Sequence, residues 1–114
     1  MDKSDVLNLA RSFAALVNAS LPISRTWLYG SWAYGSPNDE SDIDIAFELD
    51  SQPENILTAE KTLYRLRRSV DSRIEPVVIS PDRDRSGFSQ MVVAKGIESA
   101  FDPAEDTRRH GGST

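Results

Sequence analysis

Two short motifs in the first half of the chain combine residue types that can bind phosphate and metal. The first is a turn of small residues, Gly30-Ser31, with Gly35 behind it, and the second is the pair Asp42 and Asp44. Glycine lets a backbone approach an anion closely, a helix that begins there directs free N–H groups at it, and the serine hydroxyl adds a donor. Two carboxylates can hold divalent ions that stabilise an in-line phosphoryl displacement. Together the motifs predict transfer of a nucleotidyl group from a nucleoside triphosphate.

The two aspartates lie at the start of an alternating apolar run, which comprises Ile43, Ile45, Phe47 and Leu49. Such alternation predicts a half-buried strand, on which Asp42 and Asp44 project together from the face opposite the core, with Cα atoms about 6.5–7 Å apart. Each motif alone has a plain structural explanation, because Gly-Ser pairs commonly form turns and Asp-x-Asp can be solvent-facing alternation. Their occurrence in this order, with a short connection, favours one shared site.

Helical and extended patterns alternate along the first half of the chain. Apolar residues at helical spacing predict a helix over about residues 4–18, which buries this stripe. Residues 26–29 predict a short strand that ends at Gly30, and residues 36–40 form a polar loop before the aspartate strand. The alternation is typical of an α/β protein.

The second half continues with helices and short strands. A turn at residues 51–53 starts a helix whose apolar face comprises Ile56, Ala59, Leu63, Leu66 and Val70. Residues 73–79 form a β-branched run behind that helix, which predicts the next strand of a βαβ-like unit. A last helix is expected over about residues 88–95, ended by Gly96, with a short strand near residues 97–101.

With Gly30-Ser31 followed by Asp42 and Asp44, the chain resembles the minimal nucleotidyltransferases, small members of the DNA polymerase beta-like nucleotidyltransferase superfamily. The resemblance extends to Gly35 and Ser41. It implies an α/β fold around a small mixed sheet packed with helices, magnesium held by Asp42 and Asp44, and triphosphate binding at Gly30-Ser31. The family carries a third acidic residue on a later strand, and Glu75 is the candidate here for both the catalytic and the metal-binding role.

Glu75 fits that role on physical grounds as well. It lies among apolar residues, where an ionised carboxylate is costly unless it is paired or bound to a metal. The alternative is a surface glutamate on an edge strand, which Pro76 favours because it removes a ladder donor. Many relatives have aspartate at this place. The longer side chain leaves open a weaker metal geometry or a role as general base toward the acceptor hydroxyl.

Several other residues allow two interpretations. Lys61, Arg65 and Arg68, extended by Arg67, could meet phosphates or an acidic partner, although a solvated helix face is the favoured interpretation. Trp32 and Tyr34 could stack on a base or line a partner surface, and core packing is expected for at least one of them. Relatives often carry a basic residue near Tyr34, and its absence here leaves one phosphate contact open.

Bulk properties indicate a small single domain over residues 1–101, followed by a polar segment, residues 102–114, in which we expect disorder. The net charge of −5 argues against direct nucleic-acid binding over the whole surface. The chain has no cysteine, no signal-peptide pattern and no apolar stretch that approaches a membrane span. A cytoplasmic location, where nucleoside triphosphates are available, is the default expectation.

The resemblance implies transfer of a nucleoside monophosphate, AMP from ATP, to a hydroxyl acceptor. Stand-alone domains of this kind commonly pair with a helical HEPN-type ribonuclease, as the antitoxin of a toxin–antitoxin couple, and some modify a toxin tyrosine with AMP. The competing hypothesis is an antitoxin that neutralises its partner by complex formation without chemistry. A third is a small-molecule nucleotidyltransferase, although those enzymes generally carry a further domain for the acceptor.

Overall fold

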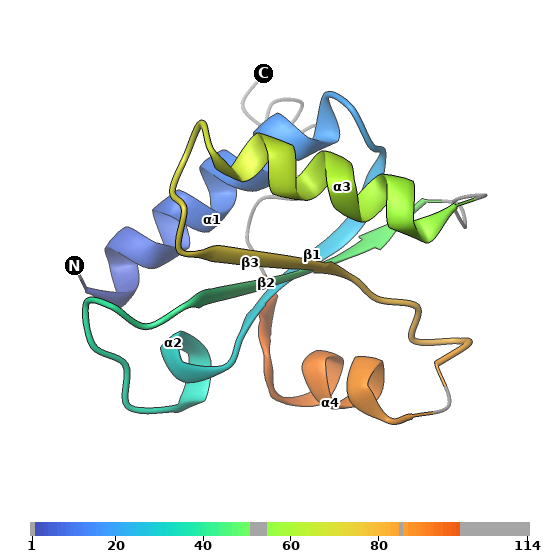
Figure 1. Ribbon diagram of the computed structural model, residues 1–114. Helices are drawn as coiled ribbons and strands as arrows, with labels where there is room; N and C mark the ends of the chain where they lie inside the picture. The colour runs from blue at the N-terminus through green and yellow to red at the C-terminus, as the bar shows by residue number, and fades with distance from the viewer. Residues whose placement is uncertain (1, 51–54, 85, 99–114) are drawn as a thin grey trace, which may run out of the picture.

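The chain forms a mixed sheet with helices on both faces, as a computed structural model that describes residues 2–50, 55–84 and 86–98 shows (Figure 1). Within these residues the sheet has four strands in the order β3-β2-β1-β4. The elements in chain order are α1 (Lys3–Asn18), β1 (Ile23–Tyr29), α2 (Ser31–Tyr34), β2 (Ile43–Leu49), α3 (Ile56–Arg67), β3 (Ile74–Val78), α4 (Phe88–Lys95) and β4 (Ile97–Glu98). The predicted α/β class and mixed sheet are therefore confirmed.

The sheet is mixed because of its two kinds of connection. β1 pairs antiparallel with β2 and with β4, whereas β2 pairs parallel with β3. A parallel pair requires a crossover, and α3 supplies it, so β2, α3 and β3 form the βαβ unit that the sequence predicts. β3 is an edge strand, which is where Pro76 can be accommodated without the loss of a ladder hydrogen bond.

The helices begin and end close to the predicted residues. α1 is capped by a reciprocal pair of hydrogen bonds in which the Asp2 and Asp5 side chains each accept from the other's backbone N–H. α3 is capped by the Asn55 side chain, whereas the predicted turn at residues 51–53 lies outside the described residues. Ile56 is 42% exposed and does not join the buried face of α3, because contact with the core begins one turn later, at Ala59.

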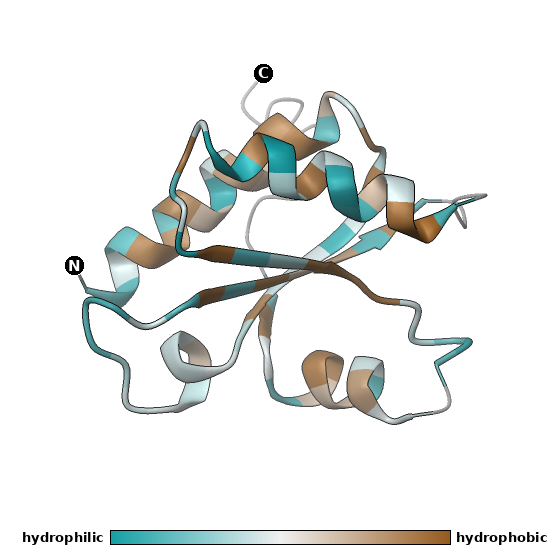
Figure 2. Cartoon of the chain, viewed as in Figure 1, coloured by the Kyte–Doolittle hydropathy of each residue, from teal (hydrophilic) through white to brown (hydrophobic). Residues whose placement is uncertain are grey.

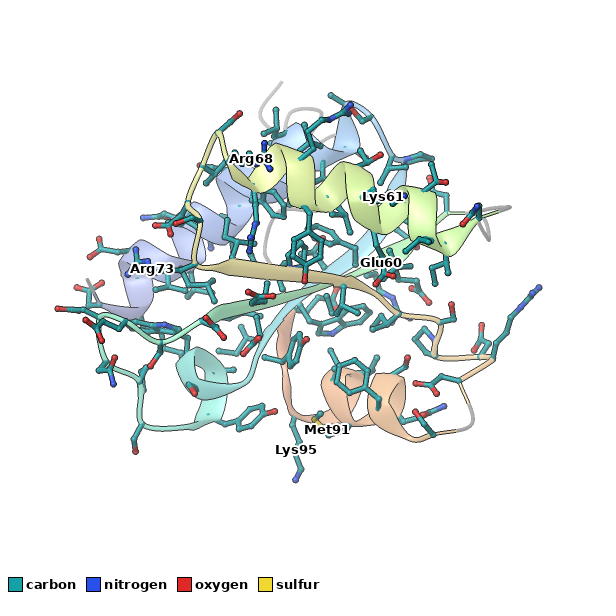
Figure 3. All side chains as sticks on the ribbon, viewed as in Figure 1. Glu60, Lys61, Arg68, Arg73, Met91 and Lys95 are labelled. Carbon is teal, nitrogen blue, oxygen red and sulfur yellow. The ribbon has the colours of Figure 1, made fainter. Side chains whose placement is uncertain are left out.

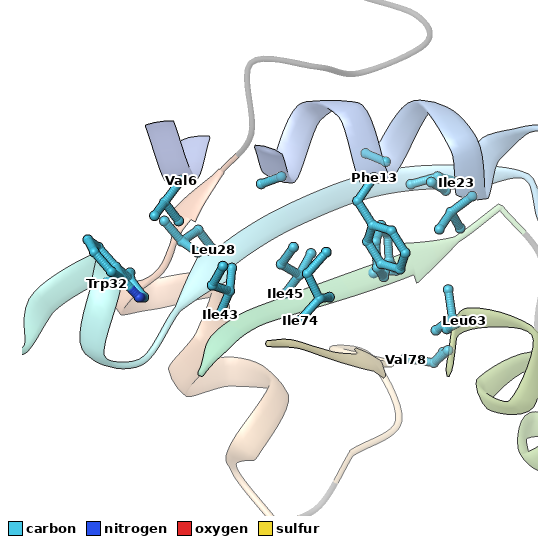
Figure 4. Packing of buried hydrophobic residues seen from close by; sticks show 14 of the residues in the cluster. Val6, Phe13, Ile23, Leu28, Trp32, Ile43, Ile45, Leu63, Ile74 and Val78 are labelled. Carbon is cyan, nitrogen blue, oxygen red and sulfur yellow. The ribbon is translucent and has the colours of Figure 1, made fainter. Parts of the chain in front are cut away.

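The sheet carries two cores of unequal size. α1 and α3 cover one face and α4 lies against the other (Figure 1), and both α1 and α3 alternate apolar with hydrophilic residues along their length (Figure 2). The larger core joins α1 and α3 to the sheet and includes Phe13, Ile45 and Leu63 (Figure 4). The smaller core, on the α4 side, consists of Trp27, Ala46, Ile79 and Val92. The face that carries Asp44 is therefore partly covered, rather than open to solvent throughout.

The helices of the described part of the chain are all too short or too polar to cross a membrane.

Candidate active site

Three side chains form a row across the sheet on the α4 side. The register pairs Tyr29 of β1 with Asp44 of β2, and Asp44 with Glu75 of β3. Neighbouring strands lie about 4.8 Å apart, so a residue and its register partner project side by side from one face. Asp42 is the residue before β2 and is exposed, whereas Asp44 and Glu75 are partly buried. The sheet thus brings Asp44 and Glu75, which are far apart in the sequence, into adjacent positions.

The Gly30-Ser31 turn lies directly against the Asp44 carboxylate. Gly30 has a φ of 73°, in the region that favours glycine, and a Cβ atom at this position would collide with Oδ2 of Asp44. The two sequence motifs therefore meet in space through the backbone of Gly30. Gly35 closes the turn for a similar reason, because a Cβ atom there would lie 2.9 Å from the Cα of Ser31.

The single helical turn α2 begins at this glycine. The N–H groups of Ala33 and Tyr34 donate to the Gly30 carbonyl over 3.0 and 3.1 Å, and Gly35 N–H donates to the Ser31 carbonyl over 2.9 Å. The N–H groups of Ser31 and Trp32 precede this pattern and belong to the first turn, whose donors are directed away from the helix. Ser31 is exposed, so its hydroxyl and backbone donors can reach an anion.

The aromatic residues of this turn have separate positions. Trp32 is 6% exposed and packs in the larger core, which fixes the turn against the sheet, so the predicted core role is confirmed for this residue. Tyr34 is 50% exposed, and its hydroxyl donates to Sδ of Met91 over 3.4 Å. Sequence reasoning also missed Lys3, whose ammonium donates to the Ala33 carbonyl over 3.2 Å and brings a cation to the turn from α1.

Electrostatic repulsion connects the acidic residues. Partial burial, and then the charges of Asp42 and Glu75, raise the pKa of Asp44 above its usual value. Burial and the neighbouring Asp44 carboxylate likewise raise the pKa of Tyr29. A cation placed among these carboxylates would relieve the repulsion, which is the electrostatic situation expected at a site for a divalent ion.

Glu75 has partners on α3 that sequence reasoning missed. The Tyr64 hydroxyl donates to Oε2 of Glu75 over 3.0 Å, and Nη1 of Arg67 lies 3.4 Å from Oε1. The same Nη1 donates to the Ile74 carbonyl over 2.9 Å, and the Arg67 guanidinium lies 4.8 Å from the centre of the Tyr64 ring. Arg67 therefore faces β3. Lys61 and Arg65 of α3 are exposed, as is Arg68, which directly follows the helix, and Figure 3 labels Lys61 and Arg68. The three-residue spacing of Tyr64 and Arg67, one turn apart on a helix that crosses to β3, was the available sequence signal.

The carboxylate oxygens are of the type that binds magnesium, but the three carboxylates are not grouped closely enough in this structure to bind one ion together. Asp42 and Asp44 supply the oxygen ligands that Mg²⁺ prefers, and their repulsion favours a cation. Across residues 2–50, 55–84 and 86–98, however, no three His, Cys, Asp or Glu side chains are grouped closely enough to hold a metal ion. The Glu75 carboxylate is shared with Tyr64 and Arg67 instead. A metal site formed by Asp42, Asp44 and Glu75 together stays a prediction.

The comparison with family models identifies the class of protein. The model described as polymerase beta, nucleotidyltransferase matches residues 14–98, which include Gly30-Ser31, both aspartates and Glu75. The chain belongs to this family and is a nucleotidyltransferase. A comparison with curated proteins gives no match.

Solved structures with the same fold include minimal nucleotidyltransferase antitoxins. A candidate nucleotidyltransferase from Sulfolobus solfataricus has a TM-score of 0.62 at 20% identity, over 90% of this chain and 86% of that one. A toxin–antitoxin structure with AMP-PNP has a TM-score of 0.60 at 22% identity, over 85% and 77%. A tri-AMPylated HEPN toxin of Shewanella oneidensis in complex with its MNT antitoxin gives 0.58 at 21% identity, over 90% and 77%. At these identities the likeness shows the fold.

Proposed function

We propose that the chain is a magnesium-dependent nucleotidyltransferase that transfers AMP from ATP to a hydroxyl of a HEPN-type toxin, whose antitoxin it is. The observation that carries the proposal is the contact between Gly30 and the Asp44 carboxylate, which joins a phosphate-binding turn to an acidic site within the family's fold. The similar structures support the choice of nucleotide and partner, since one holds AMP-PNP and another an AMPylated HEPN toxin. A cytoplasmic location, where ATP is available, belongs to this proposal.

Each site residue has a part in the reaction. The Gly30-Ser31 turn donates backbone N–H groups and a hydroxyl to the triphosphate, and Asp42 and Asp44, with Glu75, would hold the metal ion. Bound magnesium would neutralise charge on the phosphoryl oxygens. Glu75 accepts the proton of the acceptor hydroxyl, whose oxygen attacks the α-phosphorus as the bond to pyrophosphate breaks. The protein's share is mainly positioning and electrostatic stabilisation.

Replacement of single aspartates tests the proposal. Asp42→Ala and Asp44→Ala should each abolish transfer of AMP to a co-expressed HEPN-type partner. Transfer is detected as a mass shift on that partner. Asp50→Ala is the matched control, because Asp50 follows the same strand at its other end and is exposed. It should transfer AMP at the wild-type rate. Transfer that persists in either of the first two variants would refute the catalytic assignment.

A second candidate function is neutralisation of the partner by complex formation alone. It is favoured by the engagement of Glu75 with Tyr64 and Arg67, which occupies the third carboxylate. The double variant Asp42→Ala/Asp44→Ala separates the two functions. If it still suppresses the toxin at a one-to-one ratio, complex formation suffices, whereas loss of suppression with retained binding supports transfer.

A further inference from the structure

A hydroxyl of the protein itself is hydrogen-bonded to the carboxylate that we propose as the general base. The phenol oxygen of Tyr64 donates to Oε2 of Glu75 over 3.0 Å, which is the contact that a general base makes with the hydroxyl it deprotonates. Glu75 is the register partner of Asp44, and Asp44 touches the backbone of Gly30 at the phosphate turn. The Tyr64 oxygen is thus hydrogen-bonded to Glu75, and Glu75 lies one strand spacing, about 4.8 Å, from Asp44, which would help to hold the triphosphate.

We propose that Tyr64 is itself an acceptor, so that the enzyme modifies its own chain with AMP. The inference rests on the proposed function, because it uses the same triphosphate and the same acidic site. The Tyr64 proton passes to the Glu75 carboxylate, the phenol oxygen bonds to the α-phosphorus of ATP, and the bond from that phosphorus to the bridging oxygen breaks. Pyrophosphate leaves with the electron pair, and the products are O-adenylylated Tyr64 and pyrophosphate.

The surroundings of Tyr64 suit both the reaction and its product. The side chain is 40% exposed, so the ring lies at the surface and leaves room for an attached nucleotide. The Arg67 guanidinium, 4.8 Å from the ring centre, carries the positive charge that would pair with the transferred phosphate. The other two tyrosines are placed differently. Tyr29 is partly buried in the sheet against Phe88, and the Tyr34 hydroxyl is bonded to Met91.

The test is incubation of the full chain with magnesium and α-labelled ATP, followed by trypsin digestion and mass spectrometry. Trypsin separates Tyr64 from the other two tyrosines, because it cleaves after Lys61 but finds no lysine or arginine between Thr26 and Glu60. Tyr29 and Tyr34 therefore stay together in peptide 26–61, and Tyr64 is released in peptide 62–65. We expect one AMP on peptide 62–65, located on Tyr64 by fragmentation.

Matched variants make the result specific. Tyr64→Phe keeps the ring beneath Arg67 but lacks the acceptor oxygen, and it should lose the label. Thr62→Ala removes the other side-chain hydroxyl of peptide 62–65 and should keep the label. Asp44→Asn should lose the label as well, which would exclude uncatalysed adenylylation. A label that persists in Tyr64→Phe, or one found on peptide 26–61 instead, would overturn the inference.

Pyrophosphate release and label on an added HEPN-type partner are measured in the same samples. If pyrophosphate is released or the partner is labelled while peptide 62–65 stays unmodified, self-modification is refuted and the proposed function stands. If ATP is recovered intact and no protein carries a label, both fail.

Discussion

At the scale of single residues, Gly30 shows how much the site depends on a missing side chain. In Gly30→Ala the new Cβ would collide with Oδ2 of Asp44, at a φ of 73° that alanine rarely adopts. Strain of this kind costs about 1–3 kcal/mol, and relief of the collision would move Asp44. We expect a loss of stability in urea unfolding and a larger loss of ATP binding, measured by calorimetry with magnesium present.

Gly87→Ala is the matched control for that experiment. Gly87 also has a positive φ, 87°, but a Cβ atom there would meet nothing within 4 Å. It should therefore show the loss of stability from strain alone and bind ATP like the wild type. If the two variants bind ATP equally well, the contact between Gly30 and Asp44 does not organise the nucleotide site.

Asp44 illustrates a conflict between stability and chemistry. Its raised pKa means that the ionised form is disfavoured in the folded protein, through burial and the charges of Asp42 and Glu75. At neutral pH without magnesium, Asp44→Asn removes that repulsion and should stabilise the fold by roughly 1 kcal/mol or less, because solvent screens a partly exposed charge. Thermal unfolding measures the difference. Magnesium should stabilise the wild type more than the variant, and a variant less stable than the magnesium-free wild type would contradict the repulsion.

At the scale of elements, the turn between α3 and β3 is fixed by an ion pair. Nη2 of Arg73 lies 2.6 Å from Oδ2 of Asp71, and the Arg73 backbone N–H donates to Oδ1 over 2.8 Å. A further bond from Nη1 of Arg73 to the Asp39 carbonyl, over 2.6 Å, ties the turn to the loop before β2. The hydrogen bond from the Arg73 side chain lowers the pKa of Asp71 below its usual value.

A lowered carboxyl pKa predicts a pH dependence with a definite sign. The unfolded chain binds the Asp71 proton more tightly than the folded chain, so the contribution to stability is complete above the unfolded pKa of about 3.9 and is lost as the pH falls through the folded value. Asp71→Asn should therefore be less stable than the wild type at neutral pH, and the gap should close below about pH 4. Urea midpoints across this range test it, with Asp50→Asn as the control. A gap that is independent of pH would mean that the ion pair contributes nothing.

Local patterns predicted most elements because the interactions that form them are local. The alternation from Ile43 to Leu49 predicted β2, and the helical spacing of apolar residues predicted α1. A helix between two strands predicted the parallel pairing of β2 and β3. The side of the sheet that α4 covers was not predictable. Its apolar residues do not form one clear stripe, so the sequence indicated a helix but not the face that packs on Ala46.

The candidate site was likewise predictable from the sequence only in part. Types and spacing predict Gly30-Ser31, Asp42 and Asp44 as site residues, the family resemblance adds Glu75, and the register places Asp44 beside Glu75. The partners of Glu75 could not be predicted, because Tyr64 and Arg67 reach it only after α3 has crossed over to β3. Lys3 escaped notice for the same reason, since it meets Ala33 from thirty residues away. Contacts between elements depend on packing that no local pattern encodes.

At the scale of the whole molecule, the unequal cores predict unequal local stability. On the α1 and α3 side fifteen buried residues of the described chain pack together, whereas only four do so on the α4 side. Because the free energy of local opening follows the apolar surface that opening exposes, α4 should open without the rest of the fold. α4 also carries Phe88, whose ring packs edge-on against Tyr29 at 5.7 Å. The helix that packs beside Tyr29, the register partner of Asp44, would then belong to the less stable part of the molecule.

Hydrogen exchange in low concentrations of denaturant measures this directly. The α4 amides, such as Met91 N–H on the Gly87 carbonyl, should exchange at lower free energy and with a weaker denaturant dependence than those of β2. Val92→Ala should accelerate exchange in α4 with little effect on β2. Phe13→Ala removes a fully buried ring that contacts Phe47 edge-on at 5.7 Å, and it should cost roughly 3–5 kcal/mol and accelerate exchange everywhere. If α4 and β2 follow one common dependence on denaturant, the two cores form a single cooperative unit, and the stability of the site is that of the whole domain.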